Sequence, residues 1–103
     1  MILVNIDYIP GKEFDVIGVV KGSTIRSKNM FKDIGAGFKS MIGGEVKSYT
    51  KMMDEARQIA TKRMVDEAES LGADAVVNIR YASSTVMAGA SEMMVYGTAV
   101  KIR

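Results

Sequence analysis

The stretch SYTKMMDEARQIATKRMVDEAESL, residues 48–71, decides the fold. Its apolar side chains recur at spacings of three and four residues, the period of one face of an α-helix. They are Tyr49, Met52, Met53, Ala56, Ile59, Ala60, Met64, Ala68 and Leu71. Gly72 follows directly, at the position where helices commonly stop. We therefore predict a helix over residues 48–71, about 36 Å long at 1.5 Å per residue.

Strand-like segments rich in β-branched and apolar residues lie on both sides of this helix. Residues 2–7 (ILVNID) and 14–20 (FDVIGVV) precede it, and 74–81 (DAVVNIRY) and 92–103 (EMMVYGTAVKIR) follow it. Lys21-Gly22 predicts a bend after the second strand. The small polar run ASSTVMAGAS predicts a hairpin loop between the last two. The helix would fit lengthwise across strands of about 33 to 40 Å. We expect an α+β, two-layer domain with an antiparallel sheet of three or more strands packed on one long helix.

A shorter helix is predicted over residues 28–41, where apolar residues again recur at spacings of three and four. Gly35 and Gly37 weaken it, and Gly43-Gly44 ends it. Glu45 then lies just before the long helix, where the positive end of the helix dipole favours a carboxylate. A structural role for Glu45 at this helix start is one reading, and a ligand site between subunits is the other.

Composition excludes several classes of chemistry. The 103 residues predict a single domain over 1–103, and they include no Cys and no His. The chain thus has no disulfide, no thiolate or imidazole metal ligand and no histidine base. Neither a signal peptide nor a membrane span is visible, so we expect a soluble cytoplasmic protein. Serines without a histidine to activate them make an enzyme the less favoured reading.

The last strand has two apolar faces. Met94, Tyr96, Thr98, Val100 and Ile102 alternate with Met93, Val95, Gly97, Ala99 and Lys101. One helix can cover only one of these faces. An apolar face left in water is typical of an interface, so the pattern predicts a homo-oligomer.

Several motifs resemble the YbjQ-like family, whose members are uncharacterised and carry the label "putative heavy-metal-binding". The matching residues are Gly43-Gly44-Glu45, Tyr49-Thr50, the run from Gly72 to Val77 and the run from Tyr96 to Val100. The family's usual Gly-Ala-Asn-Ala is Gly-Ala-Asp-Ala in this chain. The resemblance implies a subunit similar to that of dodecin, assembled into a ring-like homo-oligomer, a pentamer. It implies no established activity.

Soft heavy metals prefer the thiolates and imidazoles that this chain lacks, so carboxylate, amide and thioether ligands remain. Met52-Met53 and Met93-Met94 could hold Cu(I), but methionine at helical or strand spacing is usually part of the core, and a hard cation held by carboxylates is the favoured reading. The candidate ligands are the acidic residues at the end of the long helix and just beyond it, Asp66, Glu67, Glu69 and Asp74. A divalent cation is the cofactor that such a carboxylate site would hold. A solvated face, or pairing with basic residues of a neighbouring subunit, explains the same cluster.

A ligand pocket between subunits is the second candidate site. Its predicted residues are Glu45, Arg57, Arg80 and Glu92. The basic residues Lys21, Arg26, Lys28, Lys32 and Lys39 could attract an anion, but no nucleic-acid motif accompanies them, so nucleic acid is not the expected partner. We expect them to complement the acidic helix end of the next subunit. The identity of any small-molecule or ion ligand stays open.

Overall fold

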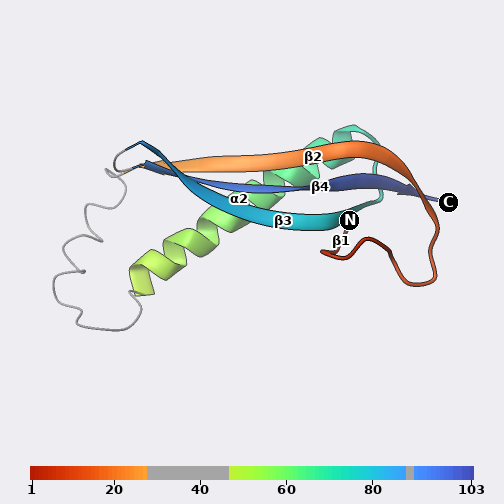
Figure 1. Cartoon of the computed structure of the whole chain (residues 1–103), viewed down its shortest axis with the longest axis horizontal. Helices are drawn as coiled ribbons and strands as arrows, with labels where there is room; N and C mark the ends of the chain where they lie inside the picture. Colours follow the sequence, from red (N-terminus) through yellow and green to blue (C-terminus); the bar gives the residue numbers. More distant parts are fainter. Residues whose placement is uncertain (28–46, 88–89) are drawn as a thin grey trace.

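The computed structural model describes residues 1–27, 47–87 and 90–103. Four strands and one helix follow one another along these residues (Figure 1). They are β1 (Ile2–Leu3), β2 (Phe14–Ser27), α2 (Lys47–Ser70), β3 (Ala75–Met87) and β4 (Ala90–Ile102). The strands form one sheet in the order β1-β3-β4-β2, and α2 covers one of its faces.

The predicted fold class is confirmed: one long helix packs on a mainly antiparallel sheet in two layers (Figure 1). The long helix lies within one residue of the predicted range at each end. The shorter helix predicted over residues 28–41 lies outside the described residues, as do Gly43-Gly44, Glu45, Lys28, Lys32 and Lys39.

Three details of the predicted strands are wrong. β2 is continuous through Lys21-Gly22, because Gly22 serves a packing contact and not a bend. The predicted hairpin loop is mostly strand: β3 continues to Met87 and β4 begins at Ala90, since ladder hydrogen bonds use the backbone and tolerate small polar side chains. β1 has only two residues and pairs parallel, not antiparallel, with β3.

The buried residues of α2 lie in a single row, each four positions after the last: Met52, Ala56, Ala60, Met64 and Ala68. Such rows run obliquely to the helix axis, so this row suits a helix that lies across a twisted sheet. Three of the five side chains are methyl groups, which lets the helix backbone come close to the strands.

The closest approach is at Gly22 of β2. A Cβ placed there would collide with the backbone oxygen of Ala60 and the backbone nitrogen of Met64. Arg63 also donates from its guanidinium to the Ser23 carbonyl at 2.6 Å. Because no side chain fits between β2 and α2 at this point, only glycine allows the two layers to meet.

The two faces of β4 divide as predicted. Met93, Val95 and Ala99 are buried in the core beneath α2, together with Val20 and Val76. On the opposite face, Val100 is buried in a smaller cluster with Ile9, Ala75 and Val77, which the N-terminal segment covers. Farther along that opposite face, Met94 and Thr98 are half-buried and Tyr96 is exposed.

Gly72 ends α2, as predicted. Its φ is +78°, in the left-handed region that favours glycine. Its N–H donates to the Glu69 carbonyl at 3.0 Å, and the N–H of Ala73 donates to the Ala68 carbonyl at 3.1 Å. These two bonds form a Schellman motif, which turns the chain directly into β3.

We predict that Gly22→Ala lowers the free energy of unfolding by about 2 to 3 kcal/mol, because the layers must separate to admit one methyl group. Gly18→Ala on the same strand is the matched control, since a Cβ there meets no atom within 4 Å. Urea unfolding followed by circular dichroism measures both. Equal stability of the two variants would contradict this account of the helix–sheet contact.

Candidate functional site

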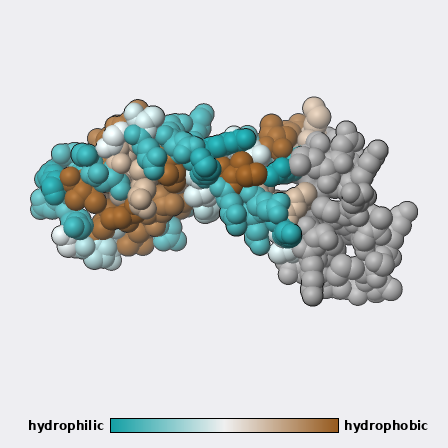
Figure 2. Space-filling model, turned by 180° about the vertical axis from the view of Figure 1, so that it is seen from behind, coloured by the Kyte–Doolittle hydropathy of each residue, from teal (hydrophilic) through white to brown (hydrophobic). Residues whose placement is uncertain are grey.

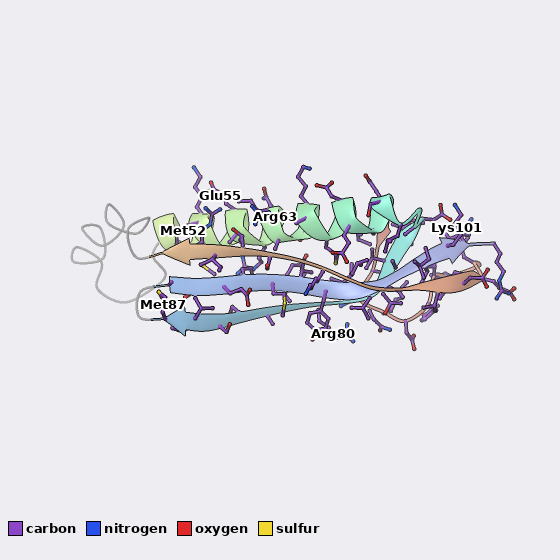
Figure 3. All side chains as sticks on the ribbon, turned by 90° about the horizontal axis from the view of Figure 1, so that it is seen from above. Met52, Glu55, Arg63, Arg80, Met87 and Lys101 are labelled. Atoms are coloured by element: carbon purple, nitrogen blue, oxygen red, sulfur yellow. The ribbon has the colours of Figure 1, made fainter. Side chains whose placement is uncertain are left out.

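A trough lies beside β3, because α2 packs on β2 and β4 and hardly touches β3. Figure 3 shows α2 next to β2, with β3 on the far side of β4. The strand β3 therefore keeps the helix-side surface of its central residues open. Tyr81 and Ser83, which pair with the core residues Val95 and Met93 of β4 and so share the helix side, are both exposed.

The N-terminal segment forms the outer wall of this trough. It follows β1 along β3 as far as a bulge at Asn78, whose φ is +55°. The bulge turns two backbone N–H groups toward the segment: Asn78 donates to Ile6 at 2.9 Å and Ile79 to Val4 at 3.2 Å. Arg80 completes the attachment by donating to the Asn5 carbonyl at 2.8 Å. Asparagine is among the residues that tolerate this positive φ, which explains its place there.

The larger of two adjoining hollows in the trough has a volume of about 490 Å³. It is lined by Leu3, Val4, Asn5, Ile6, Ile79 and Tyr81. Four of these six side chains are aliphatic. The volume lies within the range of small-molecule sites, roughly 300 to 1,000 Å³.

The smaller hollow, of about 210 Å³, shares Tyr81 with the larger one. It is lined by Arg57, Tyr81, Ala82, Ser83 and Met93, and Arg57 is its only charged residue. The Arg57 guanidinium also contacts the Asp54 carboxylate at 2.5 Å, one turn earlier on α2. Both partners of this ion pair are largely exposed, so it contributes little to stability.

Hydrogen bonds fix the direction in which the Tyr81 hydroxyl points its proton. The Thr61 hydroxyl donates its one hydrogen to the Arg57 carbonyl at 2.7 Å. The Tyr81 hydroxyl lies 3.0 Å from the same Thr61 oxygen, so Tyr81 must be the donor in that bond. The phenolic oxygen of Tyr81 therefore faces the trough as an acceptor.

Of the four residues predicted for a ligand pocket between subunits, the three that the structure describes do not share one hollow within a single chain. Arg57 lines the smaller hollow, and Arg80 supports the wall of the larger one through Asn5. Arg80 and Glu92 belong to the opposite side of the sheet, where Arg80 pairs across to Tyr96 and Glu92 to Ser84. Glu45 lies outside the described residues. The prediction missed Tyr81 and the N-terminal wall, because only the register of β3 shows which side of the sheet they share.

The four predicted metal ligands are likewise separate. Within the described ranges, no three Asp or Glu residues are grouped so that they could hold a metal ion. Asp66 forms an ion pair with Lys62 at 3.0 Å. Within the described part of the chain, the carboxylates of Glu67 and Glu69 have no side-chain partner, whereas their backbone carbonyls accept hydrogen bonds from Ser70 and Gly72.

Asp74 has a structural task instead. Its carboxylate accepts a hydrogen bond from the Ile102 backbone N–H at 2.8 Å and lies 3.4 Å from the Lys101 ammonium. The bond from Ile102, followed by the contact with Lys101, lowers the pKa of Asp74 below its usual 3.8, against a smaller opposing effect of desolvation. The carboxylate thus ties the end of β4 to the start of β3.

A second candidate surface is the exposed row of apolar residues on β2. Val16, Val19 and Ile25 are 67%, 74% and 57% exposed. Their cross-strand partners on β4 are Val100, Thr98 and Glu92. Figure 2 shows that hydrophobic residues also reach the surface broadly at the end of the molecule that carries the termini. A row of this kind on an edge strand is a ready contact surface.

Comparison with known proteins identifies the family. The whole chain, residues 1–103, matches the family model YbjQ_1, described as "Putative heavy-metal-binding". The chain belongs to this family. It is 66% identical to a UPF0145 protein of Clostridium novyi (strain NT), with 99% of each chain covered. It is 65% identical to a UPF0145 protein of Alkaliphilus metalliredigens, with 98% of each covered.

A solved structure supports the fold of this YbjQ-family chain. A protein of unknown function from Pediococcus pentosaceus, assigned to the DUF74 family, superposes with a TM-score of 0.72 at 15% identity. The match covers 100% of this chain and 98% of the other. At that identity the likeness shows the fold alone. In the described part of this YbjQ-family chain, no helix is both long enough and apolar enough to span a membrane.

We predict that Asp74→Asn destabilises the protein near pH 7 and that this effect shrinks as the pH is lowered below 3.8. A lowered folded-state pKa adds stability above the usual 3.8, and this stability is lost as the pH falls through the folded pKa. Thermal unfolding of both proteins across this pH range measures the difference. Asp66→Asn is the control, since its carboxylate bonds only the exposed Lys62 side chain. A pH-independent effect of Asp74→Asn would contradict the role assigned to the carboxylate.

Proposed function

We propose that this single-domain chain is the subunit of a cytoplasmic homo-oligomer that acts as a binding or scaffold module. The exposed apolar row on β2 carries this proposal. Val19, at 74% exposure, lies in the middle of a fourteen-residue strand that pairs only with β4 among the described residues. A lone chain would hold this row in water at a cost of about 25 cal/mol per Å².

The contact joins different surfaces of two copies. Besides the row on β2, exposed apolar residues occur at the far end of β3, where Val86 and Met87 are 48% and 66% exposed. From Arg80 to Met87, the outer edge of β3 has no strand partner in the described part of the chain. A contact between the β2 row of one copy and this part of β3 on the next would cover both surfaces.

A contact between different surfaces repeats from copy to copy, and it closes into a ring when the rotation allows. We propose such a ring, with five subunits. The Ser23 carbonyl of β2 already accepts a hydrogen bond from Arg63. A neighbouring strand could therefore not form an unbroken ladder of backbone hydrogen bonds along β2, and side chains would make most of the contact. The trough beside β3 would then lie near each boundary between subunits.

A carboxylate-based cation site is the second candidate function, and the family description supports it. Such a site would use carboxylate oxygens, because the chain has no Cys and no His, and the thioethers of Met52 and Met93 are buried in the core. Since no suitable group forms among the described residues of one chain, a site built on Asp66, Glu67, Glu69 or Asp74 would need further ligands from beyond them, and a second copy of the chain is one source.

We predict that Val19→Lys weakens assembly by about tenfold or more, because it places a charge in an apolar contact. Gln58→Lys is the matched control: it adds the same charge at an exposed position on the outer side of α2. Native mass spectrometry of untagged protein, purified without chelator, gives the subunit number and any retained ion.

A ring for the wild type and Gln58→Lys, with smaller species for Val19→Lys, is the expected result. A wild-type monomer at micromolar concentration, or an unchanged ring in Val19→Lys, would refute the proposed assembly. Extra mass in proportion to the subunits that disappears on dialysis against chelator would favour the cation site.

A further inference from the structure

We propose that the trough beside β3 binds an amphipathic carboxylate, with its hydrocarbon body in the larger hollow and its carboxylate on Arg57. This inference rests on the proposed binding function, and it names the class of ligand. It concerns the helix side of β3, whereas the proposed contact between subunits uses the β2 row and the outer edge of β3.

The larger hollow suits a hydrocarbon chain. Leu3, Ile6 and Ile79 are among the aliphatic side chains that line it, and Tyr81 lines both this hollow and the smaller one. Ile79 is buried and belongs to the main core, so this part of the lining is fixed. Leu3 and Ile6 are 39% and 40% exposed, and a bound chain would shield them from water. No charged side chain lines this hollow.

The smaller hollow supplies the positive end. Arg57 is its only charged residue, and neither hollow is lined by a carboxylate. The guanidinium has five donors, of which the ion pair with Asp54 uses a part, so a second carboxylate can be accepted beside it. The Ser83 hydroxyl, on the same hollow, is a further donor.

The orientation of the ligand follows from the Tyr81 hydroxyl. Its hydrogen is used on Thr61, so its oxygen offers only lone pairs to the trough. A carboxylate placed against that oxygen would meet an acceptor and be repelled. The anionic group is therefore directed past Tyr81 to Arg57, while the hydrocarbon part stays beside Ile79.

Octanoate is the test ligand, and octanol is its uncharged counterpart. Calorimetric titration into the assembled wild-type protein should show octanoate binding at least about tenfold tighter than octanol, the size expected for one charge-assisted contact. Arg57→Gln should remove this preference while leaving octanol binding unchanged. Lys62→Gln, which removes the same charge from an exposed ion pair on α2, is the matched control and should bind like the wild type.

The position of the ligand is measured by methyl NMR spectroscopy on the same samples. Octanoate should shift the methyl signals of Leu3, Ile6 and Ile79 and leave that of Ile25, on the opposite face of the sheet, unchanged. Circular dichroism and native mass spectrometry verify that Arg57→Gln folds and assembles as the wild type does.

Two results would overturn the proposal. One is the absence of octanoate binding at millimolar concentration to an intact ring, the result expected if side chains of a neighbouring copy fill the trough. The other is equal octanoate affinity in Arg57→Gln and Lys62→Gln. Either result leaves the proposed assembly standing, because that is judged separately by the subunit number and by Val19→Lys.

Discussion

The contact between the backbone of α2 and Gly22 of β2 is the constraint on which the other features depend. Glycine on the strand and Ala56, Ala60 and Ala68 on the helix allow the layers to approach until a Cβ has no room. This approach draws the helix over β2 and β4. The same displacement leaves the helix side of β3 open, so the packing of the core and the existence of the trough have one physical cause.

The rest of the trough depends on the bulge in β3. Asn78 takes a positive φ, and two successive N–H groups then hold the carbonyls of Val4 and Ile6. Without this bulge the N-terminal segment would have no anchor beyond the two residues of β1. The bulge at Asn78 thus holds the N-terminal segment in place as the outer wall of the trough. Bulges are common near functional sites.

The family description names heavy-metal binding, but this chain lacks the residue types that heavy metals prefer as ligands. The thiolates and imidazoles that soft metals prefer are absent from the sequence, and Asp74, one of the predicted oxygen ligands, accepts a hydrogen bond from the backbone N–H of Ile102 at the end of β4.

The sequence by itself determined the helix over residues 48–71, its stop at Gly72 and the two apolar faces of the last strand, because each is a local period or a local backbone preference. It also determined that thiolate and imidazole chemistry are excluded. Only the tertiary structure decided that Gly22 is a contact and not a bend, and that Arg57 shares a hollow with Tyr81 while Glu92 does not. Those facts depend on strand register and on the lateral position of the helix, which arise from contacts between residues far apart in the chain.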